Sequence, residues 1–141
     1  MIYPYAEDPS RALDAAVRAL EGDGLVVLPT DTVYGIGANA FSPAAVERLL
    51  AAKGRGRQMP PPVLVARPEV ASALAADLPD GVRALMEAFW PGALTVIVRA
   101  QPALAWDLGE TAGTVALRMP DHPVALAVLE RGLHVFAQQG F

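Results

Sequence analysis

Residues 25–37 read Leu-Val-Val-Leu-Pro-Thr-Asp-Thr-Val-Tyr-Gly-Ile-Gly, an apolar run followed by a segment rich in hydroxyl groups. The run at residues 25–28 is continuous and of strand length, which is typical of a buried strand. Residues 30–37 are predicted to follow it as a loop. Because α/β proteins place ligands where a strand ends in a loop, this stretch favours a binding site at that point.

Helices and strands alternate along the rest of the chain. Asp8 and Ser42 each precede a proline, which predicts two capped helix starts. A further helix is predicted to begin with Asp80 as its cap and to bury one apolar stripe, made of Val82, Leu85, Met86 and Phe89. The remaining predicted helices begin at Pro68 and at Pro123, and the remaining predicted strands lie at residues 62–66, 93–98, 114–117 and 133–136. This alternation predicts an α/β fold in a single domain.

The composition limits the classes of function. The 141 residues are 53% hydrophobic and 18% charged, with a formal net charge of −4, which argues against a protein that coats nucleic acid broadly. There is no cysteine, and the two histidines, His122 and His134, have no metal-ligand spacing, so no metal site is expected. No apolar run approaches the roughly 20 residues that span a bilayer. We therefore expect a cytoplasmic protein without a membrane partner.

The hydroxyl-rich segment carries Thr30, Thr32 and Tyr34. Their hydroxyl groups can bind a small zwitterion or a carbonyl oxygen, and Gly35 and Gly37 would allow a ligand to approach the backbone closely. The alternative is that these side chains only form the turn by local hydrogen bonds. Spacing alone favours the alternative.

A compact cationic segment follows the second predicted helix. It contains Lys53, the only lysine of the chain, with Arg55 and Arg57. Alternating cations on a glycine-loosened segment can wrap a triphosphate, because guanidinium groups bind phosphate oxygens in pairs. The segment is not a P-loop, and a solvated helix end with cations favoured by the dipole explains it equally well.

Three more polar positions lie on predicted strands. Thr95 and Arg99 alternate to the same face of one strand. Arg118 closes another, where a lone arginine is more often a surface residue. His122 is interpreted as part of a helix start.

Four blocks occur in one order: LPTDTVYG at residues 28–35, AKGR at 52–55, FWPGALT at 89–95 and VALRMP at 115–120. This series resembles the YrdC-like family, the threonylcarbamoyl-AMP synthases, from about residue 10 to 131. The resemblance implies a twisted, mixed β-sheet with flanking helices over residues 1–141. It also implies a nucleotidyltransferase of tRNA modification that condenses L-threonine, bicarbonate and ATP and releases pyrophosphate.

The resemblance also implies roles for single residues. L-Threonine would be bound by Thr30, Thr32, Tyr34 and Arg99. ATP and the bicarbonate-derived carboxylate would be bound by Lys53, Arg55, Arg57, Thr95 and Arg118, with Lys53 and Arg55 in the catalytic role. Mg²⁺ is expected on the phosphates, although the sequence shows no dedicated carboxylate cage. The tRNA would be reached indirectly, through the proteins that transfer the threonylcarbamoyl group.

The chain departs from the family pattern after residue 131. The family carries a Ser-x-Asn motif there, whereas no serine follows Ser72 and no asparagine follows Asn39. With one choice of codons, residues 134–139 read out of phase give Thr-Ser-Ser-Pro-Asn-Arg, which suggests a frameshift; a natural short variant or a partial domain stays open. We expect impaired activity and self-association through an exposed sheet edge. A non-catalytic RNA-binding module and a carbamoyl-adenylate-forming domain remain alternative functions.

Overall fold

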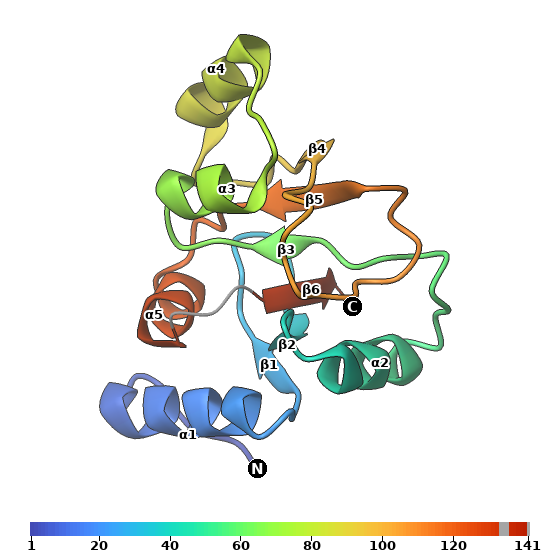
Figure 1. Ribbon diagram of the computed structural model, residues 1–141. Helices are drawn as coiled ribbons and strands as arrows, with labels where there is room; N and C mark the ends of the chain where they lie inside the picture. Colours follow the sequence, from blue (N-terminus) through green and yellow to red (C-terminus); the bar gives the residue numbers. More distant parts are fainter. Residues whose placement is uncertain (133–135, 141) are drawn as a thin grey trace.

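The computed structural model describes residues 1–132 and 136–140 (Figure 1). Its helices are α1 (Pro9–Glu21), α2 (Pro43–Ala52), α3 (Pro68–Leu74), α4 (Asp80–Phe89) and α5 (Pro123–Gly132). Its strands are β1 (Val26–Leu28), β2 (Gly35–Asn39), β3 (Val63–Leu64), β4 (Val96–Arg99), β5 (Thr114–Arg118) and β6 (Phe136–Gly140). Within this part of the chain, no helix is both long and apolar enough to cross a membrane.

The strands form one mixed sheet in the order β1-β2-β6-β3-β5-β4. β3 and β5 run parallel, and every other neighbouring pair is antiparallel. β6 lies between β2 and β3, with Ala137 opposite Ala38 on one side and Val63 on the other. The predicted α/β fold with a mixed sheet and flanking helices is confirmed.

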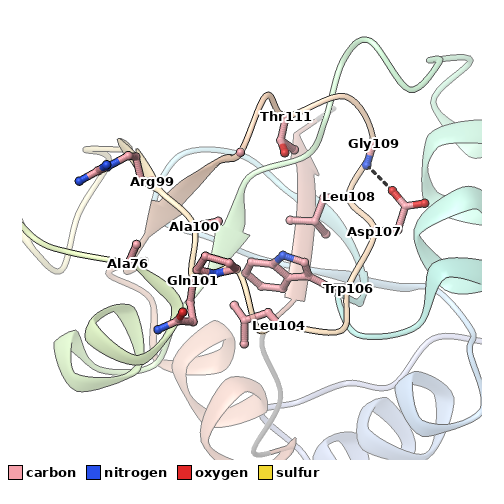
Figure 2. A pocket seen from close by; sticks show the side chains of 12 residues that line it. Ala76, Arg99, Ala100, Gln101, Leu104, Trp106, Asp107, Leu108, Gly109 and Thr111 are labelled. Carbon is pink, nitrogen blue, oxygen red and sulfur yellow. Dashed lines mark hydrogen bonds between the residues drawn. The ribbon is translucent and has the colours of Figure 1, made fainter.

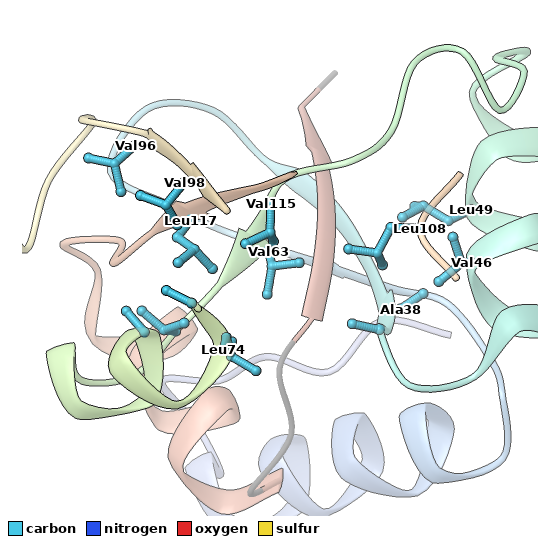
Figure 3. Packing of buried hydrophobic residues seen from close by; sticks show 14 of the residues in the cluster. Ala38, Val46, Leu49, Val63, Leu74, Val96, Val98, Leu108, Val115 and Leu117 are labelled. Atoms are coloured by element: carbon cyan, nitrogen blue, oxygen red, sulfur yellow. The ribbon is translucent and has the colours of Figure 1, made fainter. Parts of the chain in front are cut away.

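The sheet has an apolar core on each face. Val63 and Leu64 are neighbours in β3, so their side chains point to opposite faces. Val63 belongs to the larger cluster, which the strands β2, β4 and β5 build with α2 and α3 (Figure 3). Leu64 belongs to the smaller cluster with α1 and α5, through Leu20, Val128 and Leu129. The helices therefore fix the sheet from both sides.

Local signals predicted the helix starts well. The Asp8 carboxylate accepts a hydrogen bond from the Arg11 amide at 3.1 Å, and the Ser42 hydroxyl accepts one from the Ala45 amide at 3.2 Å. Nδ1 of His122 accepts from the Val124 amide at 3.1 Å, which confirms His122 as part of a helix start. Asp80 is not a cap: Pro79 holds that position, and Asp80 is the first helical residue.

Two predictions about elements were wrong. Residues 35–37 were expected in a loop, but they begin β2, because β1 and β6 pair with this glycine-rich segment from both sides. In α4, Met86 is buried, whereas Leu85 and Phe89 are 45% and 58% exposed. Only one side of α4 meets the larger core. Of the strand predicted at 133–136, residues 133–135 lie outside the described residues, and Phe136 begins β6.

Candidate functional site

Residues 29–34, here called the hydroxyl loop, join β1 to β2. Thr30 is buried, and its hydroxyl donates a hydrogen bond to the Val33 carbonyl. The Thr32 amide donates to Thr30 Oγ1 at 3.3 Å, and the two threonine hydroxyl oxygens lie 3.2 Å apart. Tyr34 is 63% exposed. The turn-forming role that the sequence favoured is therefore present, and it leaves Thr32 and Tyr34 accessible at the surface.

Arg118 is the last residue of β5, and its side chain contacts this loop. Its Nε donates to the Gly92 carbonyl at 3.0 Å, one Nη contacts Thr32 Oγ1 at 3.5 Å, and the other donates to the Asp31 carboxylate. The expectation of a surface arginine was wrong, because Arg118 is only 8% exposed. The structure brings Thr30, Thr32 and Arg118 together, and it adds Asp31.

The turn after α4 contacts this arginine through the Gly92 carbonyl. Gly92 donates its amide to the Met119 carbonyl at 2.8 Å, and Nε1 of Trp90 donates to the Leu94 carbonyl at 2.9 Å. A Cβ atom at Gly92 would lie 2.6 Å from the Phe89 carbonyl oxygen, so the close approach requires glycine. Residues 89–95 are thereby docked on residues 115–120, two blocks that are separate in the sequence.

The cationic segment begins where α2 ends. Lys53 is the C-cap of α2, and Gly54 has a φ of +62°, which glycine adopts without strain. Lys53 and Arg55 are both half-buried. The Gly54 turn ends the helix, and the three cations then alternate with glycines along the segment, with Arg57 exposed.

Arg57 is bound to a different part of the chain. Its guanidinium pairs with Asp107 at 2.7 Å, and its carbonyl accepts the Glu110 amide at 2.8 Å. The Asp107 hydrogen bond raises the pKa of Arg57. The Arg57 hydrogen bond, joined by one from the Gly109 amide, lowers the pKa of Asp107. Arg57 therefore anchors the loop between β4 and β5.

Arg99 is on the exposed face of β4, and Thr95, directly before the strand, is exposed as well. Arg99 pairs with Asp77 at 3.1 Å and lies opposite Thr114. Thr114 is four residues from Arg118 along β5, a distance of about 13 Å. Arg99 thus lies at the other end of the β4–β5 pair from the hydroxyl loop.

A pocket of about 430 Å³ lies at that end (Figure 2). Its apolar lining includes Leu104, Trp106 and Leu108, and its polar lining includes Arg99 and Gln101. The Trp106 ring is stacked on Phe41 with centroids 5.3 Å apart. Arg99 is the only predicted site residue that lines this pocket.

Sequence reasoning missed the role of Asp31. Its partner Arg118 is 87 positions away, and no spacing rule links them. The available signal was an acid between two threonines at a strand end. Among the described residues, no group of three or more His, Cys, Asp and Glu side chains is placed to hold a metal ion.

The fold and these contacts define a mixed α/β domain in which a buried arginine ties a hydroxyl-bearing loop to a glycine turn. The chain belongs to the Sua5/YciO/YrdC family, whose sequence model, described as telomere recombination, matches residues 18–137.

Named relatives and solved structures agree with that assignment. A Mycobacterium tuberculosis relative is 55% identical over 123 residues, covering 87% of this chain and 57% of its own length. A Bacillus subtilis protein named threonylcarbamoyl-AMP synthase is 43% identical over 132 residues, covering 92% of this chain and 38% of its own. The crystal structure of P. abyssi Sua5 complexed with L-threonine has a TM-score of 0.85 at 35% identity, covering 90% of this chain and 37% of that one. The chain thus spans from about a third to just over half of these relatives.

Proposed function

We propose that this domain forms threonylcarbamoyl-adenylate from L-threonine, bicarbonate and ATP, with release of pyrophosphate. The observation that carries the proposal is the hydroxyl loop. Thr32 stays accessible there, while Arg118 contacts Thr32 and pairs with Asp31. Support comes from relatives named threonylcarbamoyl-AMP synthase and from the solved P. abyssi Sua5 complex with L-threonine.

In this proposal the domain positions reactants and neutralises charge. The threonine amine attacks the carbon of bicarbonate, water leaves, and a carbamate forms. A carbamate oxygen then attacks the α-phosphorus of ATP, and pyrophosphate leaves with the bonding electrons. Neither step needs a protein nucleophile, because preorganised cations that stabilise developing phosphate charge supply the catalysis.

Residues are assigned to these steps as proposals. Lys53 and Arg55 neutralise the phosphates and the bicarbonate-derived carboxylate, and Arg57 and Thr95 lie on the nucleotide side. Thr30, Thr32 and Tyr34 bind L-threonine. For Arg99 and Arg118, binding of carboxylate or phosphate stays a prediction from the resemblance.

Further parts of the proposal concern the surroundings of the reaction. Mg²⁺ would be held mainly by the ATP phosphates, as is usual for this ion, and would neutralise their charge. The product would pass to transfer proteins that act on tRNA. Self-association and a cytoplasmic location stay predictions from the sequence.

The test is pyrophosphate release in the presence of L-threonine, bicarbonate and ATP. We expect Lys53→Ala and Arg55→Ala each to lower kcat/KM by about 10²-fold or more, since each removes a charge that stabilises the transition state. Arg48→Ala is the matched control, because Arg48 is an exposed cation on α2 whose guanidinium donates to the Asp23 carbonyl at 2.9 Å. Its activity should stay within about 2-fold of wild type, the range expected away from the site.

Omission of single substrates separates the alternative functions. Pyrophosphate release that persists without L-threonine would contradict the threonine assignment and favour a carbamoyl-adenylate-forming domain. Salt-dependent RNA binding without any pyrophosphate release would favour the RNA-binding module.

A further inference from the structure

We propose that Asp31 is a positioning residue: paired with Arg118, it fixes the hydroxyl loop as a hydrogen-bond acceptor for the amino-acid substrate. This rests on the proposed function for the identity of that substrate. In this proposal Arg118 acts through Thr32 and Gly92, whereas the resemblance makes it a ligand of carboxylate or phosphate; the calorimetry described below separates these two roles.

The first step is the use of the Arg118 donors. Nε donates to Gly92, and the two Nη atoms are directed at Thr32 Oγ1 and at the Asp31 carboxylate. Each of the three guanidinium nitrogens therefore has a protein acceptor. These acceptors come from two segments, the hydroxyl loop and the turn after α4, so a single side chain sets their relative position.

The second step is the burial of the pair. The side chains of Arg118 and Asp31 are 9% and 17% exposed. A buried guanidinium charge is costly without a counter-charge, and Asp31 supplies it inside the loop itself. The exposed pair of Arg131 with Asp14, with side chains 44% and 45% exposed, is a contrast within the same chain.

The third step is the direction of the hydrogen bonds. The Thr30 proton goes to the Val33 carbonyl, so in its contact with Thr32 the Thr30 oxygen must accept. Thr32 Oγ1 therefore donates its only proton to Thr30 and accepts from Arg118. Because a hydroxyl oxygen has two acceptor sites, one remains on Thr32 Oγ1.

The fourth step is the consequence for a ligand. Thr30 Oγ1 already accepts from both the amide and the hydroxyl of Thr32, so it has no acceptor site left. Neither hydroxyl has a proton to offer. The loop thus offers the free site on Thr32 Oγ1 to a donor such as the α-ammonium group of an amino acid. A carboxylate finds no hydrogen-bond donor on these two hydroxyl groups.

The experiment is isothermal calorimetry on the full chain, with L-threonine and ATP titrated separately. We expect Asp31→Asn and Arg118→Lys each to raise the Kd of L-threonine at least 10-fold and to change that of ATP less than 2-fold. The double variant should bind L-threonine no more weakly than the weaker-binding single variant, because both changes break the same Asp31–Arg118 pair. Asp14→Asn, the control in the exposed pair, should bind both ligands like wild type.

Unchanged threonine affinity in Asp31→Asn would overturn the proposal. So would weakening confined to ATP in Arg118→Lys, which would make Arg118 a phosphate ligand. Equal loss of both ligands in both variants would also overturn it, since that indicates general disruption of the fold.

Amide hydrogen exchange without ligand separates this proposal from the proposed function. Asp31→Asn should accelerate exchange at Thr32 and Gly92 at least 10-fold and leave Ala38 within 2-fold of wild type. If wild type binds no L-threonine, the proposed function fails while the exchange still tests the positioning pair. If Asp31→Asn exchanges the Thr32 and Gly92 amides at the wild-type rate, the positioning role of the Asp31–Arg118 pair is contradicted.

Discussion

At Gly92 there is no room for an added methyl group, since its Cβ would lie 2.6 Å from the backbone oxygen of Phe89. We expect Gly92→Ala to lower the free energy of unfolding by about 1–3 kcal/mol, because a backbone atom cannot rotate aside as a side chain does. Chemical denaturation of the purified variant measures this change. The same substitution should weaken the Arg118 contact with the Gly92 carbonyl.

Gly81 is the matched control for that substitution. It is the second residue of α4, and an added Cβ there would have no atom within 4 Å. Gly81→Ala is expected to be neutral or to stabilise by up to about 1 kcal/mol through helix propensity. Equal stability of the two variants would contradict the steric argument.

Asp107 should make stability depend on pH. Hydrogen bonds from Arg57 and Gly109 lower its pKa in the folded state, so its contribution is present above the unfolded pKa of about 3.9 and is lost as pH falls through the folded value. We expect Asp107→Asn to have a lower Tm than wild type at pH 7, with the difference shrinking as the pH falls below about 3.9. A difference that stays constant across this range would argue against the pairing.

Residues whose roles depend on near neighbours were predictable. Asp8, Ser42 and His122 act within three positions, and their roles at helix starts are confirmed. Arg118 was misjudged because its burial depends on Asp31, which is 87 positions away. The assignment of ligands to single side chains stays a prediction.

At the scale of elements, α4 shows why periodicity alone overstates burial. Met86→Ala should cost about 2–5 kcal/mol, because Met86 is 6% exposed within the larger core. Leu85→Ala, at a position 45% exposed, should cost only about 0.5 kcal/mol. Thermal or chemical unfolding of the two variants compares them directly. Equal losses of stability in the two variants would indicate that Leu85 is buried like Met86, as the sequence predicted.

The strand β2 was hidden from sequence reasoning for a different reason. Its segment Gly35–Asn39 contains two glycines, which have low strand propensity. The strand forms because β1 and β6 pair with it from both sides. Such pairing is tertiary, and β6 lies about 100 positions further along the chain. The alternation of helices and apolar runs elsewhere was enough to predict the α/β fold.

At the scale of the whole molecule, β6 joins the two parts of the sheet. Ala137→Pro removes a backbone donor from a strand that has a neighbour on each side. We expect a loss of at least about 2–3 kcal/mol and a broadened unfolding transition, measured by denaturation followed by circular dichroism.

Asp80→Pro is the control for that variant. Asp80 is the first residue of α4, where proline is favoured and no ladder bond is lost. Its stability should stay within about 0.5 kcal/mol of wild type. If Ala137→Pro unfolds like this control, β6 does not join the sheet as described.

Three of the four sequence blocks come together only in the whole molecule. Residues 28–35, 89–95 and 115–120 meet at Arg118, as their shared place in one resemblance suggested. The cationic segment instead meets the loop between β4 and β5 through Arg57. The order of the blocks along the chain was enough to predict the family, whereas the contacts between the blocks could be seen only in the folded structure.

The place of β6 has a consequence for how a ribosome must make this protein. Synthesis delivers β1, β2, β3, β4 and β5 before the strand that lies between β2 and β3. Until residues 136–140 leave the exit tunnel, the inner edges of β2 and β3 have no partner strand, and they are open to pairing with neighbouring nascent chains. Closure of the sheet therefore waits for β6, and a pause in synthesis before residues 136–140 emerge lengthens the time for which a chaperone must cover these edges.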